Sequence, residues 1–107
     1  MYKLKFSNFI YEDIESSVSY IKNDLQNTIA AQKLKKEIQK AYKKIKLTPL
    51  IYPLVPVEKL ANKGFRFILV KNYMLFFRAK TEEKIINIER FLYGPRDWAN
   101  ILGDIET

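Results

Sequence analysis

Apolar residues in the second half of the chain fall into three short runs that predict strands. The runs cover residues 65–70, 73–79 and 85–93 and are rich in Ile, Val, Phe and Tyr. Lys71-Asn72 separates the first two runs, and the polar stretch 80–83 precedes the third. Short β-prone runs divided by turn-forming residues are typical of an antiparallel meander. We therefore expect three consecutive strands joined by tight turns.

The first half of the chain predicts one strand and two helices. Residues 2–6 alternate between apolar residues and lysine, as in a short edge strand. Apolar residues then recur at spacings of three and four over residues 9–25 and 29–47, which predicts two amphipathic helices. Ser7-Asn8 and Asn27-Thr28 precede these helices as candidate caps. The short link between the helices predicts an antiparallel hairpin.

Prolines and glycines define the remaining segments. Thr48-Pro49 ends the second helix, and two further prolines keep the chain extended before a polar turn at 58–63. Gly94-Pro95 is expected to start a short C-terminal helix, followed by a frayed tail at 103–107. The order β-α-α-β-β-β-α predicts one α+β domain over residues 1–107. Its helical hairpin would cover one face of the sheet and leave the other face open and basic.

Several classes of function are excluded by the composition. The 107 residues include no cysteine and no histidine, which removes disulfides, thiolate or imidazole metal sites and histidine-based catalysis. Only three glycines are present, and neither a P-loop nor a dinucleotide-binding motif occurs. We therefore expect no metal and no cofactor. No apolar run approaches the roughly 18 residues that cross a bilayer, and the N-terminus lacks signal-peptide features, so a cytoplasmic protein without membrane contact is expected.

Basic residues dominate the charged positions and indicate an anionic partner. The net charge is +7, and all four arginines fall between residues 66 and 96. Arginine binds phosphate and carboxylate in a planar, bidentate manner, so this clustering favours anion binding at the sheet. The second predicted helix carries a lysine-rich face that either binds phosphate or is only solvated: Lys33, Lys35, Lys36, Lys40, Lys43, Lys44 and Lys46.

Cationic and aromatic residues of the meander could support RNA cleavage without metal. Such cleavage needs a group that activates a 2′-hydroxyl, a cation beside the phosphate and a proton donor. Arg66 and Arg96 could stabilise the phosphate, and Tyr73 and Tyr93 could stack on bases or donate a proton. The alternative is structural: the tyrosines pack within the sheet, and Arg66 pairs with Glu89 across strands.

Two stretches of the meander resemble a known superfamily. They read GFRFILVKNYMLFFR and IINIERFLYGPRDWANIL, and they are similar to the RelE/ParE superfamily of toxins from type II toxin–antitoxin systems. The resemblance extends over nearly the whole chain, to Leu102. It implies a cognate antitoxin that wraps the helical hairpin and the sheet in a hetero-oligomer. RelE-like members cut mRNA on the ribosome, whereas ParE-like members inhibit DNA gyrase.

The resemblance also implies site residues. In the nuclease branch, Arg66 matches a catalytic cation, Arg96 a phosphate contact and Glu58 a general base, and Tyr93 is the nearest candidate for the C-terminal catalytic position. Tyr73 stands where those enzymes have arginine, and Asn-Tyr at that point is the ParE-like form. Ribosome-dependent mRNA cleavage is the preferred expectation; gyrase inhibition and a toxin fold that only binds partners are the alternatives. The expected nucleic-acid contacts are Lys63, Lys71, Tyr73, Arg78 and Arg90.

Overall fold

A four-stranded sheet forms the centre of the computed structural model, which describes residues 1–94 and 97–103. The strands are β1 (Lys3–Phe6), β2 (Arg66–Val70), β3 (Tyr73–Lys80) and β4 (Ile85–Tyr93), arranged in the order β1-β4-β3-β2. β2, β3 and β4 form the predicted antiparallel meander, whereas β1 joins β4 in parallel. The α+β class and the meander are thus confirmed, and the parallel N-terminal strand β1 forms one edge of the sheet.

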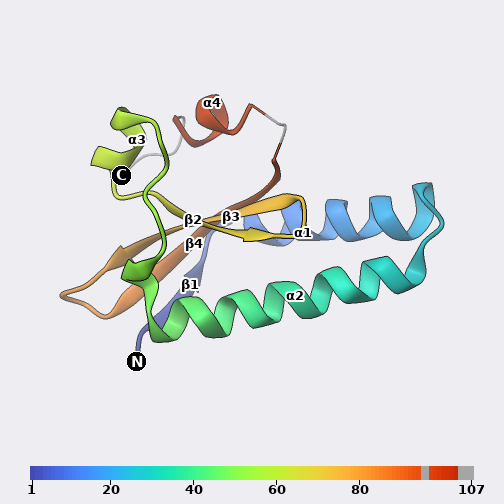
Figure 1. Ribbon diagram of the computed structural model, residues 1–107, viewed down its shortest axis with the longest axis horizontal. Coiled ribbons are helices and arrows are strands. Elements are labelled where there is room, and N and C mark those ends of the chain that lie inside the picture. The colour runs from blue at the N-terminus through green and yellow to red at the C-terminus, as the bar shows by residue number, and fades with distance from the viewer. Residues whose placement is uncertain (95–96, 104–107) are drawn as a thin grey trace.

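The helical hairpin covers one face of this sheet (Figure 1). Helix α1 (Ile10–Ser19) continues into a π-helical turn, η1 (Tyr20–Asp24), and α2 (Thr28–Leu47) runs back beside it. Asn27 caps α2, since its side-chain oxygen accepts a hydrogen bond from the Ala30 N–H at 3.0 Å. The cap expected at Ser7-Asn8 is wrong, because Phe9 precedes α1 and offers no side-chain cap.

The opposite face of the sheet is covered rather than open, which corrects our expectation. Helices α3 (Glu58–Asn62) and α4 (Trp98–Gly103) lie over it (Figure 1). The central strands are apolar on both faces, so each face needs a cover. One core lies between the sheet and the helical hairpin, and a second core lies on this opposite face. The buried residues of the second core are Val55, Leu60, Phe65, Met74, Phe76, Leu92 and Leu102.

The long connection between α2 and β2 is structured. It begins with a 3-10 turn, η2 (Pro49–Ile51), and then runs beside β2, where the Val55 N–H donates to the Phe65 carbonyl at 2.9 Å. The polar turn predicted at 58–63 is instead helix α3, because Leu60 is buried in the second core. This connection therefore shields the start of the edge strand β2.

A β-bulge interrupts the pairing of β3 with β4. Phe77 pairs with Ile88 and Phe76 pairs with Arg90, so Glu89 is the extra residue. In a regular strand, residues three positions apart point to opposite faces of the sheet. The bulge shifts this alternation along β4, so Ile88 and Phe91 both pack in the core between the sheet and the helical hairpin.

Candidate functional site

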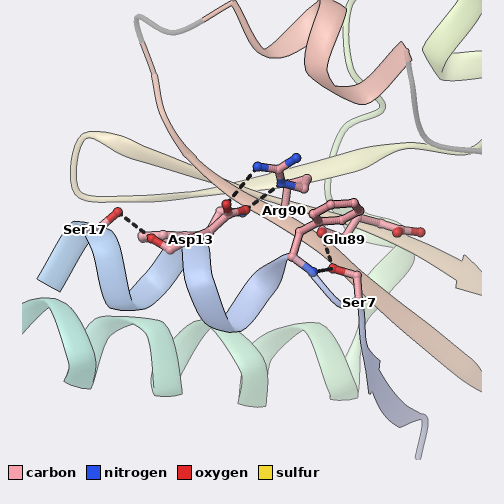
Figure 2. A network of polar contacts seen from close by, with 7 residues as sticks. Ser7, Asp13, Ser17, Glu89 and Arg90 are labelled. Carbon is pink, nitrogen blue, oxygen red and sulfur yellow. Dashed lines mark hydrogen bonds and ion pairs between the residues drawn. The ribbon is translucent and has the colours of Figure 1, made fainter.

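The outer edge of β4 is completed by side chains where β1 ends. β1 pairs only with Ile85–Ile88. Beyond that point the Ser7 hydroxyl donates to the Glu89 carbonyl (Figure 2), and the Asp13 carboxylate accepts from the Phe91 N–H at 3.0 Å. Side chains of the β1–α1 link and of α1 thus take over the hydrogen bonds that a longer strand would make.

The same carboxylate binds Arg90 in a bidentate ion pair (Figure 2). Its two oxygens lie 2.7 Å from Nε and 2.8 Å from a terminal nitrogen of the guanidinium. The side chains of Arg90 and Asp13 are only 16% and 10% exposed, and the guanidinium lies 4.8 Å from the centre of the Phe9 ring. Because this carboxylate fills the guanidinium fork, the geometry argues against the nucleic-acid contact expected at Arg90.

A second buried ion pair holds Arg78 on the other side of the bulge. Arg78 Nε donates to Glu89 Oε2 at 2.7 Å, and the guanidinium lies 4.5 Å from the centre of the Phe65 ring. Their side chains are 15% and 7% exposed. The alternative that Arg66 pairs with Glu89 is therefore wrong, and Arg78 is likewise engaged within the fold.

A groove of about 980 Å³ opens beside this edge, between α1 and the ends of β3 and β4. Phe91 stacks on Tyr73 with ring centres 4.7 Å apart and an interplanar angle of 12°. Tyr93 meets Tyr73 edge-on at 5.6 Å, and Tyr20 and Leu25 line the groove with about half of their surface exposed. The remaining lining residues are Phe9, Glu12, Asp13, Ser16, Ser17, Ile21, Asn27, Ala30, Asn72 and Arg90.

The chemistry of this groove fits an apolar partner segment better than a phosphate. Aromatic rings and aliphatic side chains form much of its lining, and Arg90, the one cation among the lining residues, is neutralised by Asp13. Glu12 adds a solvent-exposed carboxylate. A polyanion entering the groove would lose water without gaining a free cation in this part of the described chain.

The candidate catalytic residues among the described residues do not converge. Arg66 donates to the Tyr52 carbonyl at 2.7 Å, which ties it to the connection beside β2. Arg66 pairs with Phe77 on β3, whereas Tyr93 pairs with Tyr73. Phe77 and Tyr73 are four residues apart on β3, so Arg66 and Tyr93 are separated by about 14 Å along the strand direction.

The other predicted residues are dispersed as well. Glu58 is exposed at the start of α3, and Lys63 follows that helix. Lys71 occupies the β2–β3 turn with a φ of 57°. Arg96 lies outside the described residues. Of the predicted set, the structure brings Tyr73, Tyr93 and Arg90 to the same groove, and the role of each residue stays a prediction.

Sequence reasoning named Tyr73, Tyr93 and Arg90 but missed the other residues that build the edge and the groove. Asp13 and Arg90 are separated by 77 positions, so no local spacing links them. Tyr20 and Leu25 are placed by the π-helical turn and by Gln26, whose φ is 49°. Asp13 lies in the first turn of α1, where a carboxylate stabilises any helix. Its position in the sequence therefore does not reveal the contact with Arg90.

Residues 1–94 and 97–103 contain neither a metal-binding cluster nor a membrane-spanning helix. No group of three or more histidine, cysteine or carboxylate side chains there could hold a metal ion. No helix in that part of the chain is long and apolar enough to span a membrane.

Comparisons with known proteins identify the class and then the family. The fold is similar to a solved structure described as the chromosomal ParDE TA system from P. aeruginosa, with a TM-score of 0.68 and 21% identity. The match covers 87% of this chain and 96% of that chain. Together with the family match described next, it confirms the RelE/ParE superfamily resemblance.

The sequence itself gives the family. A family model described as the ParE toxin of the type II toxin–antitoxin system parDE matches residues 4–98. The chain therefore belongs to the ParE toxin family. A comparison with curated proteins found no match.

Proposed function

We propose that this chain is the growth-arresting toxin of a toxin–antitoxin pair and that it inhibits DNA gyrase rather than cutting mRNA. One observation carries the choice of target: the candidate nuclease side chains are dispersed. Metal-free cleavage requires a base, a proton donor and a cation within about 3 Å of the reacting atoms. Arg66 and Tyr93 instead lie at positions about 14 Å apart along the strand direction.

The fate of the arginines supports the same choice. Arg78 and Arg90, two of the four, are neutralised by Glu89 and Asp13. The nuclease alternative, which was the preferred expectation from sequence, depends on Arg66 together with Arg96. Tyr73, in the ParE-like Asn-Tyr pair, supports the gyrase reading and packs against Phe91 and Tyr93.

The antitoxin is proposed to neutralise the chain by covering the groove beside β4. An apolar segment of the antitoxin would bury Tyr20, Leu25 and Tyr93, which are 51%, 56% and 44% exposed. Such a segment would contact both the helical hairpin and the sheet, in a hetero-oligomer located in the cytoplasm.

Two assays on the purified chain separate the candidate targets. We expect it to inhibit supercoiling by gyrase and to leave protein synthesis and mRNA 5′ ends unchanged in an in vitro translation reaction. Cuts at ribosome-occupied codons that disappear in the folded Arg66→Ala, Arg96→Ala double variant would reject this proposal and establish the nuclease alternative. A folded chain that affects neither reaction and does not arrest growth would favour a protein that only binds partners.

A pair of matched variants tests the antitoxin site. Leu25→Asp changes the groove, and Leu50→Asp changes an equally apolar side chain of η2 that is 50% exposed. With the cognate antitoxin as the binding partner, we expect Leu25→Asp to weaken complex formation at least tenfold and Leu50→Asp to leave it unchanged. Equal effects of the two substitutions would reject the groove as the binding site.

A further inference from the structure

The solvent face of α2 concentrates positive charge on a rigid element. The helix carries seven lysines and one carboxylate, Glu37. Glu37 meets Lys40 at 3.4 Å, but the two side chains are 38% and 66% exposed, so the pair neutralises little. The opposite stripe of α2 is buried against the sheet by Ala31, Leu34, Ile38, Ala41 and Ile45, which fixes the lysines outward.

A shallow groove runs along this face. Its volume is about 340 Å³, and no carboxylate lines it. Its lining side chains are Gln32, Lys35, Lys36, Gln39, Lys40 and Lys43, which we call the lysine face. Four ammonium groups and two amides offer hydrogen-bond donors to an anion, and the exposed Glu37 beside Lys40 is the one carboxylate of the helix.

The spacing of these lysines fits a phosphate backbone. Lys36 and Lys43 are separated by about 10 Å along the helix axis, at 1.5 Å per residue. One strand of B-form DNA presents a phosphate about every 3.4 Å along its axis, so the row spans about three such intervals, which correspond to four phosphates. Because the buried stripe packs α2 against the sheet, the row is held in place and needs little reorganisation to meet a stiff partner.

We propose that the lysine face of α2 binds the phosphate backbone of duplex DNA without reading its sequence. The face carries no aromatic side chain on which unpaired bases could stack, which disfavours single strands. It also carries no arginine for bidentate base recognition. The choice of DNA over RNA rests on the proposed function, since gyrase acts on duplex DNA and the contact would hold the toxin near its target.

The test measures how DNA binding by the whole purified chain depends on salt. A fluorescent 24-base-pair DNA duplex serves as the probe, and anisotropy gives the dissociation constant between 50 and 200 mM NaCl. Four phosphate contacts predict a logarithmic salt slope of about −3.6, or an affinity loss of about 150-fold over that range. Replacing Lys36, Lys40 and Lys43 with glutamine should reduce the slope to about −0.9 and the loss to about fourfold.

The control variant removes the same charge elsewhere. Lys3, Lys5 and Lys80 are exposed on β1 and β3, and their triple replacement by glutamine should leave the slope unchanged. Glutamine matches lysine in helix propensity, so the α2 variant should keep the native circular dichroism spectrum. The control variant should keep it as well, because its three side chains are exposed on the strands. Equal loss of binding in the two variants would overturn the proposal, because net charge alone would then explain the interaction.

Competition experiments identify the partner class. We expect the DNA duplex to bind more tightly than a single strand of equal length, a duplex RNA or polyglutamate of equal charge. Tighter binding of any of these three competitors would overturn the assignment to duplex DNA. The assay contains no gyrase, so a failure to inhibit supercoiling and a failure to bind DNA are separate results.

Discussion

The ion pair between Asp13 and Arg90 should be the most sensitive polar contact of the fold. Asp13→Ala removes both bonds to the guanidinium, at 2.7 and 2.8 Å, and the acceptor for the Phe91 N–H. The substitution leaves a charge that is 16% exposed and an edge amide of β4 without its partner. Two separate costs therefore arise from one carboxylate.

The size of the effect follows from this burial. Removing one partner of a buried ion pair costs about 3–5 kcal/mol. The residual exposure of Arg90 and Asp13 places the expected loss near 3 kcal/mol for Asp13→Ala. Asp13→Asn keeps an acceptor for the Phe91 N–H and should cost about 2 kcal/mol. For a domain of this size, 3 kcal/mol lowers Tm by about 12–15 °C.

Urea unfolding of a double-mutant cycle measures the interaction. The cycle combines Asp13→Ala with Arg90→Ala. The loss of unfolding free energy in the double variant should be about 2 kcal/mol smaller than the sum of the two single losses. The control is Glu37→Ala in the exposed Glu37–Lys40 pair, which should change stability by less than about 0.5 kcal/mol. Additive losses, or a cost of Asp13→Ala below about 1 kcal/mol, would refute the reasoning.

Three further substitutions test local features of the fold by urea unfolding. Asn27→Ala should cost about 1 kcal/mol because it removes the α2 cap, while Asn27→Ser should restore most of the loss. Gly64→Ala should cost about 1 kcal/mol because φ is 86°, although nothing lies within 4 Å of the added Cβ; a neutral result would contradict the backbone strain. Burial raises the pKa of Tyr42 from 10.0 to about 12, so its contribution to stability is complete below pH 10 and is lost as the pH rises from 10 to 12. Between pH 9 and 11, wild type should therefore lose about 1 kcal/mol more than Tyr42→Phe, and parallel pH curves would contradict this.

Much of the fold could be predicted because local patterns and packing agree. The apolar stripes of α1 and α2 are the stripes that are buried, and the runs at 65–70, 73–79 and 85–93 became strands. The covered second face was missed although the signal was present. Met74, Phe76 and Leu92 make β3 and β4 apolar on both faces, and such strands need two covering layers.

The candidate site could be predicted only where it follows from the pairing of consecutive strands in the meander. Tyr73 and Tyr93 face each other because Tyr73 begins β3, Tyr93 ends β4 and the two residues pair across these antiparallel strands. Asp13 and Arg90 meet through the parallel attachment of β1 and the bulge at Glu89, and neither feature has a sequence signature here. The groove depends on the same two features, so the sequence could name Tyr73, Tyr93 and Arg90 but not their assembly with α1 into one groove.

Arginine and lysine have different roles in this fold, because the described arginines make contacts within it and most lysines of α2 stay exposed. The arginines do cluster at the sheet, but each described one ties the sheet to a neighbouring segment or bridges two strands: Arg90 to α1, Arg78 across to β4 and Arg66 to the carbonyls beside β2. A planar guanidinium suits such buried, directional contacts, whereas a lysine ammonium is strongly hydrated and stays at the surface. The charge that remains available to an anionic partner is therefore concentrated on the lysines of α2, on the far side of the helical layer from the residues first expected to bind nucleic acid.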